Sequence, residues 1–343
     1  MRRRLDTIKS KLQSKKYNWL VTGAAGFIGS HLVQFLLDNN QRVVALDNFS
    51  TGLKDNIDYL EGHQLTLKNN SEFVFSESDI RDYESCLDAT RGIDYVLHQA
   101  AIGSVPRSIE DPITSHDSNI NGFLNIIHAS RVNNVRNFVY ASSSSVYGDS
   151  EILPKKEDQH GNPLSPYALT KSVNESYASV FSNVYGFNSI GLRYFNVFGH
   201  RQDPEGQYAA VIPKWLDAII NGSDLFINGD GSTTRDFCYI TNAVQANILA
   251  AIPEKKESLN KVYNIAANHQ ISLIELYNIM KKNVSRYLPD MQFKSPIHRD
   301  FRPGDILHSR ADVRLAEELL GYKASMSVTE GLEELIRIKC ENI

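Results

Sequence analysis

The sequence has little cysteine, no strong excess of charge and no long apolar run, and each of these absences excludes a class of protein. Its three cysteines, Cys86, Cys238 and Cys340, are widely spaced and form neither a disulfide framework nor a metal-ligand pattern. We therefore expect a reducing compartment, the cytoplasm, and no metal site. The basic start at residues 2–4 is followed by further charges rather than an apolar core, so no secretory signal is expected.

The charge and hydropathy patterns also limit the partners. A formal net charge of −4 offers no broad basic surface for nucleic acid. No stretch approaches the roughly 18 apolar residues that a membrane-spanning helix requires. We expect neither nucleic acid nor a membrane as a partner.

Short apolar runs alternate with longer amphipathic stretches from Trp19 to about Val197. This alternation predicts an α/β fold of the Rossmann type, with a doubly wound parallel sheet covered by helices on both faces. The predicted strands cover residues 18–22, 42–46, 73–77, 95–99, 137–142 and 188–194. Because ligands bind at the carboxyl ends of such strands, the site should lie where these runs end in small and polar residues.

After Asn196 the pattern breaks into loops rich in Gly, Asp and Pro, with helix-like segments at about 242–251, 273–282 and 313–320. We divide the chain into an N-terminal extension over 1–17, a dinucleotide-binding domain over 18–197 and a smaller, mostly C-terminal α/β substrate lobe over 198–343. A segment near 239–252 is expected to return to the dinucleotide-binding domain.

A glycine-rich turn, G-x-x-G-x-x-G, joins the first predicted strand to a helix. Gly23, Gly26 and Gly29 let the backbone approach a pyrophosphate, which the helix N-terminus stabilises. Asp47 ends the next strand, where a carboxylate accepts a hydrogen bond from a ribose 2′-hydroxyl and repels a 2′-phosphate. The motif therefore favours NAD over NADP. Further cofactor contacts are expected from Phe27, Ile28, Asn48, Ser50, Asp79, Ile80, Gln99, Ala100, Ala101, Ser118, Tyr167, Lys171 and Val197.

The most informative feature is the spacing of Tyr167 and Lys171, Y-x-x-x-K, downstream of a run of serines. At i and i+4 of a helix the two side chains share a face, and the ammonium together with a positively charged nicotinamide favours ionisation of a phenol whose ordinary pKa is about 10. Residues 162–166 are suited to the start of that helix. Ser143 and Ser144 leave the fifth predicted strand at the same edge, where a hydroxyl can donate to a developing alkoxide. Together these residues predict oxidation of a substrate hydroxyl by NAD.

These motifs together resemble the extended short-chain dehydrogenase/reductases that act on nucleotide sugars. The resemblance rests on the glycine turn with Asp47, the Ser-Ser-Ser-Val-Tyr-Gly run, the Tyr167 and Lys171 pair, and Leu-Arg-Tyr-Phe-Asn-Val-Phe-Gly over 192–199, and it spans about residues 17–335. Segments 99–108, 209–215 and 235–240 are similar to those of UDP-N-acetylglucosamine 4-epimerases of O-antigen pathways. The resemblance implies tightly bound NAD, a homodimer and a role in surface polysaccharide synthesis.

The resemblance also implies a mechanism and a substrate site. Tyr167 would take the proton of the sugar 4-hydroxyl, with hydride passing from C4 to NAD and back to the opposite face of a 4-keto sugar. Lys171 would bind the nicotinamide ribose, and Ser143 would share the proton path. The implied substrate contacts are Gly103, Ser104, Ser143, Ser144, Tyr167, Asn196, Gln202, Ala210, Val211, Lys214, Trp215, Ile227, Asn228, Arg235, Arg302, Asp305 and Ser309. Among them, Arg235 and Arg302 suit a diphosphate through their forked guanidinium groups.

Ser309 is the specificity residue that the resemblance implies. It stands where related epimerases restricted to unsubstituted hexoses carry a tyrosine, so its small side chain should leave room for a 2-acetamido group. This implies a UDP-N-acetylhexosamine substrate, with the corresponding uronic acids as an open alternative.

Three other functions compete with this one. Nucleotide-sugar dehydratases share the fold and the Tyr–Lys pair, but they resemble one another in carrying acidic residues after the fifth strand, where this chain has serines; the same lack weakens a decarboxylase. A UDP-glucuronate-type 4-epimerase is the main alternative, because Ser-Ser-Ser-Val-Tyr-Gly occurs there too. A non-catalytic NAD-sensing regulator is a remote alternative, because it would be expected to lose Tyr167 or Lys171.

Overall fold

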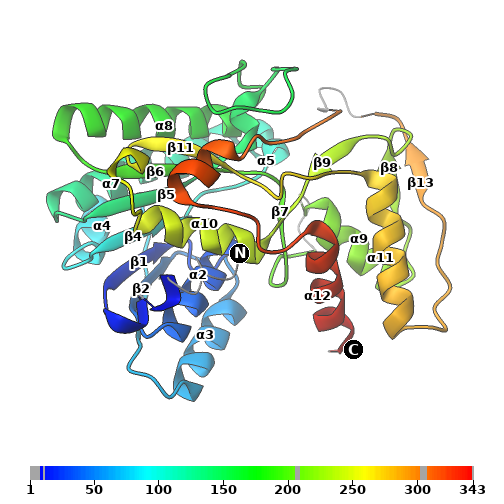
Figure 1. Ribbon diagram of the computed structural model, residues 1–343, viewed down its shortest axis with the longest axis horizontal. Helices are drawn as coiled ribbons and strands as arrows, with labels where there is room; N and C mark the ends of the chain where they lie inside the picture. The colour runs from blue at the N-terminus through cyan, green and yellow to red at the C-terminus, as the bar shows by residue number, and fades with distance from the viewer. Residues whose placement is uncertain (1–7, 11, 205–208, 302–306, 342–343) are drawn as a thin grey trace.

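A computed structural model describes residues 8–10, 12–204, 209–301 and 307–341, and it is built around one parallel sheet (Figure 1). Seven strands lie in the order β3-β2-β1-β4-β5-β6-β11, and every adjacent pair is parallel. The strands are β1 Asn18–Thr22, β2 Arg42–Asp47, β3 Glu72–Glu77, β4 Tyr95–His98, β5 Asn137–Ser143, β6 Ser189–Tyr194 and β11 Lys261–Ile265. The predicted doubly wound sheet is confirmed, and the six predicted strands agree with the observed bounds to within one residue.

Helices and short strand pairs complete the chain. The helices are α2 Phe27–Asp38, α3 Lys54–Thr66, α4 Tyr83–Ala89, α5 Val105–Glu110, α6 Pro112–His116, α7 Gly122–Val132, α8 Pro166–Tyr185, α9 Val211–Ile220, α10 Ile240–Ala251, α11 Leu273–Tyr287 and α12 Val328–Glu341, with 3-10 turns at Ser144–Tyr147 and Lys256–Ser258 and π turns at Asp117–Asn121 and Ala316–Leu320. The short strands, β7 Val197–Phe198, β8 Phe226–Asn228, β9 Thr234–Asp236, β10 Cys238–Tyr239, β12 Gln270–Ser272 and β13 Ile297–Arg299, pair as β10-β7, β12-β9 and β13-β8.

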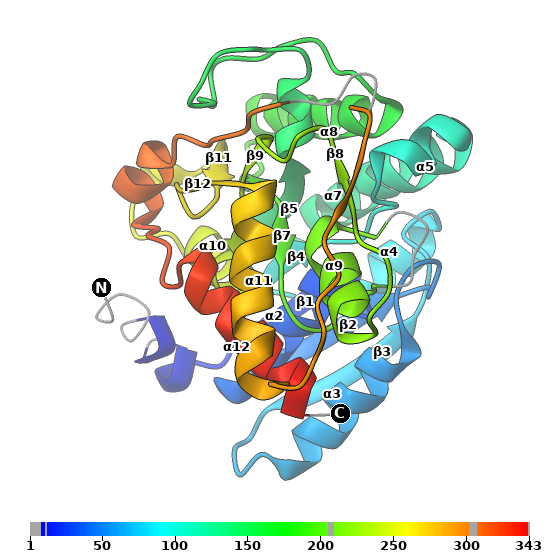
Figure 2. The same ribbon diagram turned by 90° about the vertical axis from the view of Figure 1, so that its right-hand side faces the viewer.

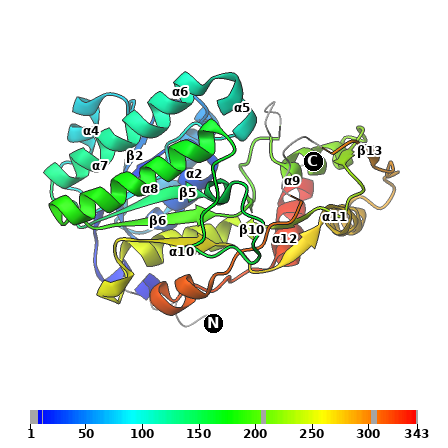
Figure 3. The same cartoon turned by 90° about the horizontal axis from the view of Figure 1, so that it is seen from above.

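Alternate side chains of each strand point to opposite faces of the sheet, and each face has its own covering helices. Trp19 and Val21 belong to a core cluster that includes side chains of α2 and α10, whereas Leu20 belongs to a second cluster with side chains of α7 and α8. Figure 3 shows α7 and α8 along one face and α10 along the other. Burial on both faces explains why the inner strands β1, β4 and β5 are largely apolar in the sequence.

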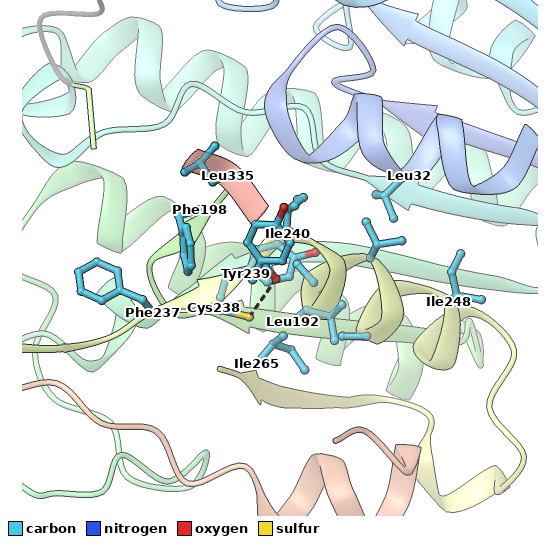
Figure 4. Close-up of a cluster of buried hydrophobic side chains, with 14 of the residues drawn as sticks. Leu32, Leu192, Phe198, Phe237, Cys238, Tyr239, Ile240, Ile248, Ile265 and Leu335 are labelled. Atoms are coloured by element: carbon cyan, nitrogen blue, oxygen red, sulfur yellow. Dashed lines mark hydrogen bonds between the residues drawn. The ribbon is translucent and has the colours of Figure 1, made fainter. Parts of the chain in front are cut away.

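The chain leaves the sheet after β6 and later returns to it. Helix α10 packs on β4, β5 and β6, as the expected return near 239–252 requires, and β11 then pairs with β6. Figure 4 shows Leu192 of β6, Ile240 and Ile248 of α10 and Ile265 of β11 meeting in one apolar cluster. Strand β11 was not among the predicted strands. Its sequence includes Asn264, whose polar side chain is buried only because it bonds to Tyr147, Lys155 and Asp312 from distant segments.

Helices α9, α11 and α12 gather at one end of the molecule, beside the short β13-β8 pair (Figure 2). Helix α11 begins with a capping box in which Ser272 and Glu275 satisfy each other's backbone N–H groups, and it runs past the predicted end at 282 to Tyr287. The helical segment expected at about 313–320 is present over 314–320, and its Ala316–Leu320 part is a π-helix. No helix in the described ranges is long and apolar enough to cross a bilayer.

The described part of the N-terminal extension packs on the sheet instead of standing free. Ile8 and Leu12 are buried in the same core as α2. The Gln41 amide fixes this segment, because its Nε2 donates to Leu12 O at 2.7 Å while its Oε1 accepts from Tyr17 N and Trp19 Nε1, both at 3.0 Å. The segment thereby covers apolar surface that the sheet would otherwise expose.

Candidate active site

A cleft lies at the carboxyl edge of the sheet, at the point between β1 and β4 where the strand order reverses. This is the position at which doubly wound sheets bind nucleotides. The predicted cofactor residues that line it are Gly23, Gly26, Asp47, Asn48, Ser50, Asp79, Ile80, Gln99, Ala100, Ala101 and Ser118. Of the others, Phe27, Ile28 and Gly29 form the first turn of α2, Tyr167 and Lys171 lie on α8, and Val197 lies on β7.

The glycine turn packs too closely for side chains. Gly23 has φ +70°, and a Cβ there would lie 2.6 Å from Ala100 N at the end of β4. A Cβ on Gly29 would lie 2.0 Å from Gly23 O. The turn therefore needs glycine at both positions, and it presents the N-terminus of α2 to the cleft as a dinucleotide pyrophosphate requires.

Asp47 closes the far side of the turn. Its carboxylate accepts hydrogen bonds from Ala25 N at 3.0 Å and Phe49 N at 2.8 Å. Burial raises the pKa of Asp47, and these backbone donors oppose the rise. Asp79, by contrast, has a pKa lowered to about 2, mainly by the hydrogen-bonded Arg81 guanidinium, and it also accepts from Asn48 Nδ2 at 2.8 Å. Two acidic side chains thus border the cleft, where they suit a ribose and an adenine rather than an additional phosphate.

Helix α8 carries the Tyr167 and Lys171 pair. The predicted start is confirmed: Ser165 Oγ accepts from Ala168 N at 3.1 Å, and Pro166 occupies the first turn, where its missing N–H costs nothing. Lys171 Nζ lies 5.8 Å from the centre of the Tyr167 ring. The Tyr167 hydroxyl is hydrogen-bonded to Ser143 at the end of β5. The structure therefore brings the predicted phenol, ammonium and serine together.

Burial dominates the electrostatics of this pair. Burial raises the pKa of Tyr167, and only the Ser143 hydrogen bond opposes it. Burial likewise lowers the pKa of Lys171 to about 8, against the effect of Glu175. Burial thus works against the phenolate, and the expectation that Lys171 and a positively charged nicotinamide together favour it stays a prediction. A further positive charge, such as the oxidised nicotinamide ring carries, is needed to lower the Tyr167 pKa.

Other predicted residues line a second cleft. The predicted substrate residues found there are Asn196, Val211, Lys214, Trp215, Asn228 and Arg235. Trp215 is mostly core, with its side chain 5% exposed and its Nε1 donating to Phe226 O at 3.2 Å. Lys214 and Arg235 give this cleft the positive charge that a diphosphate requires.

Comparison with known proteins places this site in a family. Residues 19–266 match the sequence profile of the NAD dependent epimerase/dehydratase family. The chain belongs to this family. It is 36% identical over 92% of its length to a putative UDP-glucose 4-epimerase of Methanocaldococcus jannaschii, 96% of which is covered.

Solved structures of the same family superpose over nearly the whole chain. A UDP-N-acetylglucosamine 4-epimerase from Methanobrevibacter ruminantium, in complex with UDP-N-acetylmuramic acid, has a TM-score of 0.83 at 36% identity, covering 96% of this chain and 100% of that one. A UDP-glucuronic acid 4-epimerase from Bacillus cereus, solved with NAD, has a TM-score of 0.84 at 31% identity, covering 95% and 100%. The predicted cofactor, NAD, is confirmed by the family.

Within this NAD-dependent epimerase/dehydratase, several predicted substrate residues lie outside the second cleft. Gly103 and Ser104 lie on the loop before α5, Ala210 precedes α9, and Ser144 starts the 3-10 turn after β5. Ser309 N donates to Thr234 O at 3.2 Å, which places Ser309 beside the strand that carries Arg235. Arg302 and Asp305 lie outside the described residues.

Two further predicted substrate residues, Ile227 and Gln202, do not line the second cleft. The Ile227 side chain is fully buried in the core, because β8 turns it away from the cleft surface, so it has no area to offer a ligand. Gln202 lines a different cleft, between the 199–204 loop, α9 and α12, where its amide donates to Val197 O at 3.4 Å. Its place follows from the path of the loop, which the sequence does not specify.

Three residues that position or line the site were not predicted from the sequence. Asn119, in the π turn, bonds to the backbone of Ile102: its Oδ1 accepts from Ile102 N at 2.8 Å, and its Nδ2 donates to Ile102 O at 3.0 Å. The same Nδ2 donates to Thr170 Oγ1 of α8 at 3.2 Å. Ser108 Oγ accepts from Tyr167 N at 3.0 Å. Arg299 lines the second cleft with its Cζ 3.4 Å from the centre of the Phe226 ring. Each depends on contacts between distant segments, so no local sequence pattern predicts it.

Among the described residues, no group of three or more His, Cys, Asp or Glu side chains gathers as a metal site would.

Proposed function

We propose that this NAD-dependent nucleotide-sugar 4-epimerase interconverts UDP-N-acetylglucosamine and UDP-N-acetylgalactosamine, as a step in surface polysaccharide synthesis. The observation that carries the proposal is the place of Ser309. Its small side chain stands next to the strand of Arg235, which lines the basic second cleft. A 2-acetamido group needs room close to the diphosphate, and a small residue leaves it.

The proposed chemistry uses the buried residues of α8 and β5. Tyr167 takes the proton of the sugar 4-hydroxyl, and Ser143, bonded to the same phenol, shares that proton. Lys171 supplies positive charge and binds the nicotinamide ribose. NAD, when bound, would supply a reversible hydride acceptor for C4, so that the 4-keto sugar could be reduced from the opposite face. Lys214 and Arg235 bind the diphosphate while the sugar turns.

The same geometry weighs against elimination. Dehydration requires a carboxylate that moves a C5 proton, and Glu175 does reach the serine run, because Ser142 donates to it. Its carboxylate, however, is held by the buried Arg193 at 2.7 and 2.9 Å. A ketone formed beside Tyr167 therefore has reduction as its available fate.

The first prediction concerns the substrate. Purified protein is incubated with UDP-N-acetylglucosamine, UDP-glucose or UDP-glucuronate, without added NAD, and the products are separated by sugar-nucleotide chromatography. We expect the acetamido sugar to reach equilibrium with its 4-epimer fastest, using cofactor that was purified with the protein. Preferential turnover of UDP-glucuronate would instead support the uronate epimerase, and no turnover of any 4-epimer pair would refute the proposed function.

The second prediction concerns Ser309. The Ser309→Tyr variant should lose at least about 100-fold in kcat/KM for UDP-N-acetylglucosamine while keeping turnover of UDP-glucose, because the phenol fills the space for the acetamido group. Ser309→Ala, which removes only the hydroxyl, is the matched control and should keep the wild-type preference. An unchanged ratio of the two kcat/KM values in Ser309→Tyr would show that Ser309 does not border the sugar.

The third prediction concerns assembly. We propose a homodimer that covers α8, because Leu169, Val180 and Val184 share one face of that helix at 53%, 50% and 65% exposure. Val184→Asp should convert the dimer to a monomer in sedimentation velocity. The control is Leu65→Asp on α3, where the side chain is 83% exposed; it should leave the dimer intact. A monomeric wild type, or a dimer that survives Val184→Asp, would contradict the proposed interface.

A further inference from the structure

A charged pair is buried directly behind the reaction centre. Arg193 of β6 is fully buried, and its guanidinium grips Glu175 of α8 with Nε to Oε1 at 2.9 Å and Nη2 to Oε2 at 2.7 Å. The remaining guanidinium N–H groups are also engaged: Nη1 donates to Tyr147 Oη at 2.9 Å and to Glu157 O at 3.0 Å. Both charges are therefore compensated by hydrogen bonds as well as by each other.

Glu175 also reaches the strand that carries the catalytic serine. Ser142 Oγ donates to Glu175 Oε1, and Ser142 directly precedes Ser143. On the other side of Ser142, the carbonyl of Ala141 accepts from Lys171 Nζ at 2.9 Å. Side chains of α8 thus bond to two consecutive residues at the end of β5, next to the serine that bonds Tyr167.

Stability alone does not explain this arrangement. A buried ion pair is costly to desolvate, and apolar residues of similar volume commonly serve a core as well or better. What the pair provides is a directional link between α8, β5 and β6. Apolar packing would let the helix slide by fractions of an ångström, whereas a two-point guanidinium–carboxylate contact fixes its register.

We propose that Glu175, held by Arg193, is a positioning residue that fixes α8 against the end of β5 so that Tyr167 meets Ser143 and Lys171 meets Ala141 at the same time. The proposal rests on the function proposed above. The negative charge of Glu175 has a second effect, because it opposes the lowering of the Lys171 pKa by burial. The other titratable groups near Lys171 are Tyr167 on its own helix and His98 at the end of β4, which burial keeps neutral with a pKa of about 3. Around the pair itself, His160 lies 3.2 Å from Arg193 Nη2, and burial lowers its pKa as well.

The positional effect is tested with Ser142→Ala. This variant removes the link from Glu175 to β5 but leaves the Glu175–Arg193 pair intact, so the protein should fold. We expect kcat to fall by about tenfold with KM little changed and bound NAD retained, because a small misplacement of reacting groups lowers the rate of the chemical step. Ser176→Ala, on the same helix, removes a hydroxyl that bonds only within α8 and should behave as wild type.

The electrostatic effect is tested with Glu175→Gln through the pH profile of kcat/KM. Without the negative charge the protonated form of Lys171 loses a stabilising neighbour, so its pKa falls and the alkaline limb should move to lower pH by about one unit. Glu175→Asp keeps the charge but shortens the side chain. The alkaline limb should therefore stay near its wild-type position, while kcat should be lower than in the wild type. A merely structural role would not move the limb.

Wild-type kcat in Ser142→Ala, or an unmoved alkaline limb in Glu175→Gln, would overturn the proposal. If Glu175→Gln does not fold, Ser142→Ala alone decides. Tyr167→Phe separates this proposal from the proposed function: it should keep NAD and lose turnover by several orders of magnitude. An active Tyr167→Phe would refute the function itself, whereas an inactive Tyr167→Phe beside a wild-type-like Ser142→Ala would refute only the positioning role.

Discussion

The site depends on one steric constraint, the absence of side chains in the turn after β1. Gly23 lies against the end of β4 and Gly29 lies against Gly23, each too close for a Cβ. Because the turn is so tight, Gly23 N reaches Leu46 O at 2.8 Å and the following amide of Ala25 reaches the Asp47 carboxylate. Three strands and the start of α2 are thereby fixed at one edge of the sheet. The cofactor cleft is the space that this edge leaves open.

Burial of the reaction centre has two opposite effects on its chemistry. A dry site strengthens every charge interaction, yet it raises the pKa of Tyr167 and lowers that of Lys171. Both shifts disfavour the Tyr167 phenolate and the Lys171 ammonium that proton abstraction needs. Positive charge from the bound cofactor would favour the phenolate, and negative charge from Glu175 favours the ammonium. Helix α8 is held near its start by Ser108 and Asn119, and further along by Arg193, which bonds to Glu175. These contacts keep the reacting groups in register.

Short-range sequence patterns were sufficient to predict much of the fold and part of the site. The inner predicted strands matched because burial on both faces makes them largely apolar runs. The start of α8 matched because Ser165 and Pro166 suffice to begin a helix. What escaped prediction depends on distant partners. Strand β11 contains Asn264, Arg299 reaches the second cleft only through the β13-β8 pairing, and Gln202 follows a loop into another cleft. The rise of the Tyr167 pKa by burial could not be predicted, because helical spacing indicates neighbours and not desolvation.

The central claim is that hydride leaves C4 and returns to the same carbon without meeting water. It is tested most directly with UDP-N-acetylglucosamine that carries deuterium at C4, incubated with the enzyme in ordinary water, and with mass spectrometry and NMR of the UDP-N-acetylgalactosamine formed. The account predicts that the product keeps its deuterium at C4, now on the opposite face. Loss of the label to solvent at C4 would contradict it, because it would show epimerisation by deprotonation of carbon rather than by transient oxidation.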